Sequence, residues 1–95
     1  MDVVFLRGAE ADLLEAYILF DEKGRGAAFD ASVESAISKL QAFPESGPLV
    51  FGDFRRVLLS GFPYGVFYRK HSSRLFVVAV LDLRQNPERI VDRLR

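Results

Sequence analysis

The sequence contains no cysteine, and its single histidine is His71. The absence of cysteine excludes disulfide bonds, thiolate metal sites and cysteine nucleophiles. A serine–histidine–carboxylate triad needs its histidine beside a serine in space, whereas Ser72 and Ser73 are only sequence neighbours of His71. We therefore interpret His71 as an exposed hairpin residue. With one histidine and no cysteine, we expect no metal site, although these counts leave open a site made of carboxylates alone. We also expect no cofactor.

Long apolar runs are also missing. The longest covers the seven residues Leu75–Leu81, whereas a helix that spans a membrane needs about 20. The four apolar residues Val3–Leu6 are soon followed by acids, which is not the pattern of a secretory signal. No glycine-rich phosphate-binding motif follows a predicted strand. We expect a soluble protein of the cytoplasm that does not contact a membrane.

Net charge is zero, but the charges are unevenly distributed along the 95 residues, which we expect to form one domain over residues 1–95. Ten acids oppose four bases in residues 1–54, and nine bases oppose three acids in residues 55–95. One interpretation is an acidic face and a basic face, the latter attracting an anionic partner. The other is that the two halves partly neutralise each other in the fold.

Apolar periodicity predicts two helices. Leu13, Tyr17 and Phe20 lie at i, i+4 and i+7 of a helix expected over Ala9–Lys23, which a glycine-rich link ends. The second helix is expected over Ala27–Phe43 and stops at the following proline. Because the link is so short, the two helices should form an antiparallel hairpin.

Short apolar and β-branched runs predict four strands: Val3–Arg7, Phe54–Ser60, Tyr64–Lys70 and Leu75–Leu81. The breaks between the last three suit hairpin turns, so these strands should form an antiparallel meander. Leu75–Leu81 is apolar on both faces, as in a central strand that is covered on both sides. The proline-rich and glycine-rich segment 44–53 is expected to be a loop, and a short helix is expected from Pro87. The order β-α-α-β-β-β predicts an α+β fold, with a helical hairpin packed on a small, mainly antiparallel sheet.

Basic and aromatic residues are the remaining candidates for function. The nine bases of the second half mingle with Tyr64, Phe67 and Tyr68. Arginine binds phosphate with two hydrogen bonds, and aromatic rings stack on unpaired bases. Strand alternation, however, puts Tyr64 and Tyr68 on one face and Phe67 with Arg69 on the other. The cluster is therefore not one RNA-binding face, and these arginines suit an acidic protein partner equally well.

The predicted element order accompanies four sequence segments: "ADLLEAY", "AISKLQAFPESGP", "RRVLLSGFPYGVFYR" and "LFVVAVLDLRQNPERI". Together they resemble the RelE/ParE superfamily, the small toxins of type II toxin–antitoxin operons, also called plasmid stabilisation proteins. The resemblance covers nearly the whole chain and is closer to the ParE-like branch. Many ParE-like members end the last strand with A-V-x-H-x-R-R-x-P and then an aromatic residue. Here Asp82 stands at the histidine position, Arg84 and Gln85 at the arginine positions, and Ile90 at the aromatic position.

The resemblance implies one of three functions. The first is a ParE-like toxin that inhibits an essential target by binding, with DNA gyrase as the candidate. The second is a RelE-like, ribosome-dependent mRNA endonuclease, whose catalytic candidates here are Arg84 and Asp82. Cleavage needs a proton donor and acceptor near the phosphate, and arginine is a poor one, so the binding hypothesis is favoured over the enzyme. The third is a degenerate member without toxicity.

Each of these interpretations implies a cognate antitoxin and a toxin–antitoxin hetero-oligomer. The helical hairpin and the sheet edge are the expected docking surfaces. The residues expected to bind the target are all arginines: Arg56, Arg69, Arg84, Arg89 and Arg93.

Overall fold

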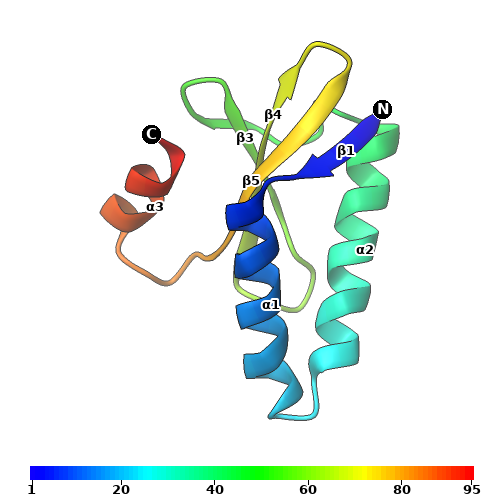
Figure 1. Cartoon of the computed structure of the whole chain (residues 1–95), viewed down its shortest axis with the longest axis vertical. Helices are drawn as coiled ribbons and strands as arrows, with labels where there is room; N and C mark the ends of the chain where they lie inside the picture. The colour runs from blue at the N-terminus through cyan, green and yellow to red at the C-terminus, as the bar shows by residue number, and fades with distance from the viewer.

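A helical hairpin, a five-stranded sheet and a short C-terminal helix make up the computed structural model, which describes all 95 residues (Figure 1). The elements follow the order β1 (Asp2–Phe5), α1 (Arg7–Asp21), α2 (Gly26–Ala42), β2 (Leu49–Phe51), β3 (Phe54–Leu58), β4 (Tyr64–His71), β5 (Arg74–Asp82) and α3 (Pro87–Leu94). The predicted α+β fold, with an antiparallel helix pair on a sheet, is confirmed.

The sheet has the strand order β1-β5-β4-β3-β2. Strand β1 runs parallel to β5, and the other neighbours are antiparallel. Strand β5 lies between β1 and β4, as its apolar composition predicts for a central strand. Parallel strands cannot be joined by a tight turn, and here the whole of the intervening chain connects β1 to β5. The pairing places the N-terminal strand beside residues about 70 positions later in the sequence.

Both faces of the sheet are buried, by different helices. The larger cluster packs under α1 and α2 and includes Leu75, Val77 and Val80; the smaller packs under α3 and includes Ala79 and Leu81. A bulge makes this division possible, since Tyr68 pairs with Val77 and Phe67 with Ala79, leaving Val78 unpaired. The extra residue reverses the alternation half-way along β5. The strand therefore supplies both clusters with residues of one apolar run.

The start of α1 differs from the prediction, because Arg7 and Gly8 belong to the helix rather than to a strand and a break. The Leu6 amide donates to the Val77 carbonyl at 3.0 Å, and the Leu6 carbonyl already accepts from Glu10 at 3.0 Å. Leu6 thus makes the last hydrogen bond of β1 to β5 and the first hydrogen bond of α1. A Cβ at Gly8 would lie 3.2 Å from Arg93 Nη2, so a glycine here makes room for that side chain.

The prediction of a loop over residues 44–53 is wrong, because it contains strand β2. Leu49 pairs with Arg55 and Phe51 with Phe54, in an irregular register. Gly52, at φ 55°, makes the turn into β3. All three residues of β2 are exposed. The strand therefore lacks the alternation of buried and exposed residues by which strands are predicted, and it depends on its pairing with β3. The other boundaries shift by no more than two residues, as is usual for element ends.

An aromatic cluster joins the far end of the helical hairpin to the sheet. Phe62 lies in a segment that the sequence marks only as a hairpin break, yet it is buried and packs edge-on against Phe20 and Phe29 at 4.8 and 5.3 Å. The Arg25 guanidinium lies over the Phe62 ring at 4.4 Å and donates to the Gly61 carbonyl at 3.4 Å. These contacts hold the tip of the hairpin on the turn between β3 and β4.

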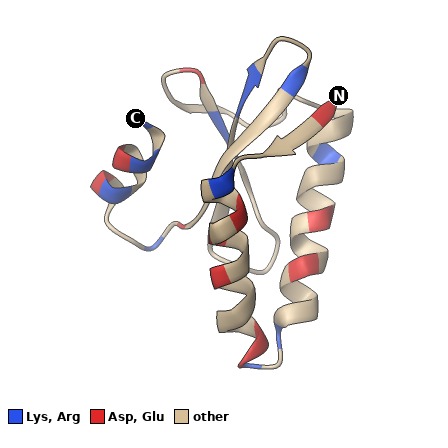
Figure 2. Ribbon diagram, in the orientation of Figure 1, with Lys and Arg blue, Asp and Glu red and all other residues tan.

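Acidic residues gather on α1 and α2, and most basic residues lie on the sheet and α3 (Figure 2). The two halves also neutralise each other in part: Arg93 pairs with Asp12 at 2.9 Å, and Arg69 with Asp53 at 3.8 Å. Each of the two interpretations of the charge distribution therefore holds for some residues. No helix is long and apolar enough to cross a membrane.

Candidate functional site

A cleft of about 250 Å³ opens where β5 ends, between α1, the start of β4 and α3. Ala16 and Leu19 of α1 form part of its apolar wall. Its polar lining consists of Asp12, Glu15, Tyr64, Asp82, Gln85 and Arg93. The lining residues of α1 fall at i, i+3, i+4 and i+7, the spacing that places side chains on one helix face. That helix face lies opposite the end of the central strand, β5.

Asp82 and Arg84 form a closed ion pair at the mouth of the cleft. Arg84 Nε donates to Asp82 Oδ1 at 3.0 Å, and Nη2 donates to Oδ2 at 2.7 Å. The Arg84 amide adds a third bond to Oδ1 at 2.9 Å. The guanidinium hydrogen bonds lower the pKa of Asp82, and burial opposes them. The predicted catalytic pair is therefore a mutually neutralised unit in which Arg84 is turned onto Asp82.

Asp12 connects α1 to two other elements. Its two carboxylate oxygens accept from Arg93 Nη1 and Nη2, each at 2.9 Å. Oδ2 also accepts from the Val80 amide at 3.0 Å, a backbone group just beyond the bulge in β5. The bond from Asp12 raises the pKa of Arg93, and the partial burial of the guanidinium opposes this. One nearly buried carboxylate thus anchors α3 through Arg93 and also accepts a hydrogen bond from a backbone amide of β5.

Tyr64 forms the floor of the cleft. Its ring lies 5.7 Å from each of the Phe20 and Phe29 rings, and only 7% of the residue is exposed. Its hydroxyl makes no hydrogen bond within the chain, although the side chain lines the cleft. Burial raises the pKa of Tyr64, the nearby Asp82 and Glu15 raise it further, and Arg84 opposes them.

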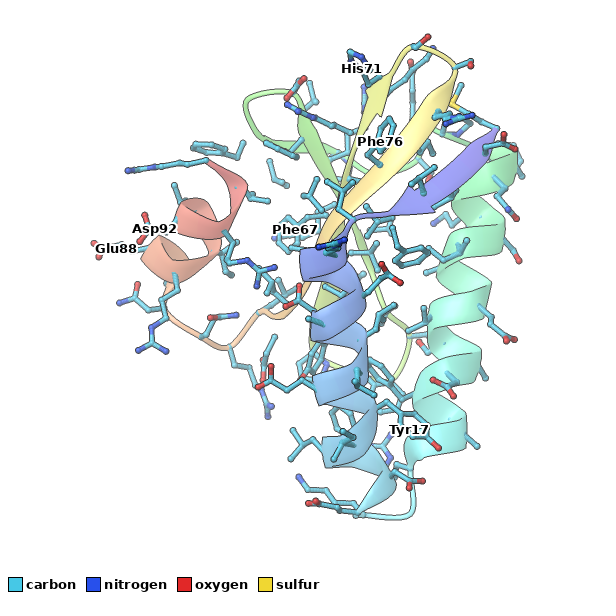
Figure 3. The ribbon with its side chains drawn as sticks, in the orientation of Figure 1. Tyr17, Phe67, His71, Phe76, Glu88 and Asp92 are labelled. Carbon is cyan, nitrogen blue, oxygen red and sulfur yellow. The ribbon has the colours of Figure 1, made fainter.

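Proton transfer at neutral pH is poorly served by this arrangement. A catalytic acid or base works best when its pKa lies near the working pH. The pKa of Asp82 is displaced downwards and that of Tyr64 upwards, in both cases away from neutrality. His71 lies at the opposite end of β4 from Tyr64, near Phe76 and the β4–β5 turn (Figure 3). No group of three or more acidic, histidine or cysteine side chains is placed to hold a metal ion.

The structure separates the five arginines expected to bind a target. Arg84 and Arg93 lie at the cleft, each on a carboxylate. Arg69 lies over the Phe54 ring at 5.1 Å, near Asp53. Arg56 lies across Gly65 on the sheet, and its buried Nε has no hydrogen-bond partner. Arg89 is exposed on α3 and has no ion pair.

Sequence reasoning missed two polar residues of the cleft, Asp12 and Glu15. It named Tyr64 only among the aromatic candidates and Gln85 only as a departure from the family pattern. The helical spacing of Asp12, Glu15 and Leu19 is readable in the sequence. The sequence does not show which residues this helix face contacts, because those contacts depend on how α1 packs across β5 and where α3 lies. Glu88 and Asp92, by contrast, project from the outer side of α3, away from the sheet (Figure 3).

The sequence matches the family described as "ParE toxin of type II toxin-antitoxin system, parDE" over residues 3–87. The chain belongs to the ParE toxin family. The match runs from β1 to the first residue of α3 and so includes every strand, the helical hairpin and the Asp82–Arg84 pair. The expected membership of the ParE-like branch is confirmed.

Among solved structures, this ParE-family chain is similar to one described as "Chromosomal ParDE TA system from P. aeruginosa". The TM-score is 0.74 at 19% identity, and the similarity covers 88% of this chain and 97% of that one. At this identity the likeness concerns the fold. No curated protein matches the sequence.

Proposed function

We propose that this ParE-family chain is a toxin that arrests growth by binding an essential target, with DNA gyrase as the first candidate. The observation that supports binding rather than catalysis is the closed Asp82–Arg84 pair. Its carboxylate is already committed to a guanidinium, and its pKa is displaced away from neutral pH. A site of this kind supplies charge and shape but no proton shuttle. The proposed action would take place in the cytoplasm, where gyrase works.

Two assays on the same purified protein test this proposal. DNA supercoiling by gyrase should fall as the protein is added, while mRNA in a translating extract should stay intact. Cuts in the mRNA that depend on the protein would instead favour the ribosome-dependent endonuclease. Induction in cells gives the third outcome, since continued growth at high expression would identify a member without toxicity.

We further propose that a cognate antitoxin neutralises the protein by forming a complex with it. Support comes from the family, whose description names a toxin–antitoxin system, and from exposed apolar side chains on two edges of the fold. Leu14 and Ile18 are 62% and 50% exposed on α1, and Leu49 is 59% exposed on the edge strand β2. Co-expression with the adjacent small gene should restore growth and yield a stable complex. A neighbouring product that does neither would contradict this part.

A further inference from the structure

The Tyr64 side chain is nearly buried, but its hydroxyl reaches the cleft and has no partner within the chain. The residue is 7% exposed, its ring packs edge-on against both Phe20 and Phe29, and the hydroxyl makes no hydrogen bond to the chain. The side chain lines the cleft at the end of β5. The hydroxyl is therefore placed to serve a group that enters from outside.

The cleft offers more hydrogen-bond acceptors than donors. Glu15 makes no ion pair or hydrogen bond, and Gln85 spends Nε2 on the Asp82 carbonyl at 3.0 Å, which leaves its Oε1 free. The terminal nitrogens of Arg93 are both committed to Asp12. An incoming group that carries several N–H donors would match these acceptors.

Charge leads to the same kind of ligand. Three carboxylates line the cleft. Asp12 is paired with Arg93 and Asp82 with Arg84, so Glu15 is the carboxylate that remains without a cation. Burial is the main cause of the raised pKa of Tyr64, and Asp82 and Glu15 add to it while Arg84 opposes them. A cation is drawn into such a cleft, and an anion such as a phosphate is repelled from it.

The size and surroundings of the cleft suit one side chain of a protein rather than a larger ligand. Small-molecule pockets measure roughly 300–1,000 Å³, whereas this cleft measures about 250 Å³. Ala16 and Leu19 provide an apolar wall for an alkyl stem, as basic side chains require. On the surface of α1, Glu15 is flanked by Ile18 at i+3 and Leu19 at i+4, which are 50% and 42% exposed. A protein segment would cover these apolar neighbours.

We infer that this cleft binds a lysine or arginine side chain of a partner protein, with apolar residues beside that side chain covering Leu19 and Ile18. The cationic group would bind the Glu15 carboxylate, the Tyr64 hydroxyl and the side-chain oxygen Oε1 of Gln85. The alkyl stem of the partner's side chain would lie along Ala16. The inference does not depend on the gyrase proposal, because it specifies the chemistry of a contact and not the identity of the partner.

Peptide titrations followed by two-dimensional NMR of the full-length protein test this inference. The probes are acetyl-Leu-Lys-Leu-amide and the same peptide with norleucine or glutamate in place of lysine. The lysine peptide should give saturable shifts at Glu15, Tyr64 and Gln85. The norleucine peptide should bind about tenfold more weakly, the loss expected for one charge-assisted hydrogen bond. n-Butylammonium lacks the apolar flanks and should also bind more weakly than the lysine peptide.

Variants separate the cleft from general acidity. Glu15→Gln and Tyr64→Phe should each weaken the lysine peptide, Glu15→Gln by about tenfold. Glu22→Gln removes an equal charge from an exposed position at the end of the same helix and should leave binding unchanged. Unchanged spectra outside the cleft show that each variant is folded.

Three results would overturn the inference. Equal binding of the lysine and norleucine peptides would reduce the site to an apolar patch. Stronger binding of the glutamate peptide would reverse the proposed charge of the ligand. Equal effects of Glu15→Gln and Glu22→Gln would show that the peptide senses only the overall acidity of α1.

Discussion

Asp12 shows how one side chain joins three elements of this protein. It lies on α1 and accepts hydrogen bonds from both terminal nitrogens of Arg93 on α3 and from the Val80 amide of β5. Its side chain is only 11% exposed. Removing one partner from such a network leaves the other polar groups unpaired, which costs more than the bonds themselves contribute.

Asp12→Ala should therefore lower the free energy of unfolding by about 2–3 kcal/mol. The loss combines an unpaired Val80 amide with a guanidinium that has lost its carboxylate. Urea denaturation of the wild type and the variant measures it. Glu10→Ala, on an exposed position of the same helix without an ion pair, is the matched control and should change stability little. Equal effects of the two substitutions would show that Asp12 has no special structural role.

Asp82 provides a pH-dependent prediction. Its pKa is lowered in the folded protein, mainly by the Arg84 side chain, while the unfolded value is about 3.9. Because the folded value is depressed, the ion pair stabilises the protein above the unfolded pKa, and this stabilisation is lost as pH falls through the folded pKa. Asp82→Asn should accordingly be less stable than the wild type near neutral pH.

The difference between wild type and Asp82→Asn should shrink as pH falls below the unfolded pKa of about 3.9 and be lost once Asp82 is protonated in the folded protein. Chemical denaturation at several pH values measures it. In an Arg84→Ala background, Asp82→Asn should have a much smaller pH-dependent effect, since the main cause of the pKa shift is gone. A difference that stays constant from neutral to acidic pH would contradict the prediction.

At the scale of elements, α3 is a short helix that depends on its packing. It has eight residues, with Pro87 at its start and the Asn86 side chain accepting from the Glu88 amide at 2.9 Å. Helices of this length are unstable alone in water. Leu94, 5% exposed, and Ile90 attach it to the cluster formed by Phe54, Phe67 and other residues of the outer sheet face.

Leu94→Ala should loosen α3 before it unfolds the sheet. Loss of about 2 kcal/mol of packing corresponds to roughly 30-fold faster amide exchange in this helix. Hydrogen exchange of residues 88–94 measures the effect, with amides of β4 and β5 as an internal reference. Asp92→Ala, on the exposed side of the helix, should leave exchange nearly unchanged. If β4 and β5 lost protection equally, α3 and the sheet would be one cooperative unit.

At the scale of the whole molecule, zero net charge conceals a separation of charge between layers. The helical hairpin is rich in acids, and the sheet and α3 hold most bases (Figure 2). Two ion pairs across the halves remove part of this separation. Arg89 remains exposed and without an ion pair on α3, and Lys23 is exposed at the far tip of the hairpin.

Reversing these two residues separates the distribution of charge from its total. Arg89→Glu and Lys23→Glu each change the net charge by the same amount. We expect Arg89→Glu to lower the salt concentration for elution from heparin more, because it removes charge from the basic side that would face a polyanion. Elution volumes on one salt gradient measure this. Identical shifts would show that only the net charge matters.

Much of the architecture was predictable from sequence because it depends on local patterns. The periodicity around Leu13, Tyr17 and Phe20 predicts α1, and the doubly apolar run from Leu75 predicts the central strand. The segments around "GFPYGVFYR" and "AVLDLRQNP" carry the family resemblance, which the match over residues 3–87 confirms. Strand β2 was missed because its exposed residues show no alternation.

The candidate site was less predictable, since its parts are distant in the sequence. The helices, the central strand and the family could be derived from the sequence, because short-range periodicity and turn chemistry encode them. The packing of distant segments places Arg93 on Asp12 and Tyr64 beneath the cleft. The reason is physical: ion pairs and cavities arise where α1, β5 and α3 pack together, and no local pattern specifies that approach.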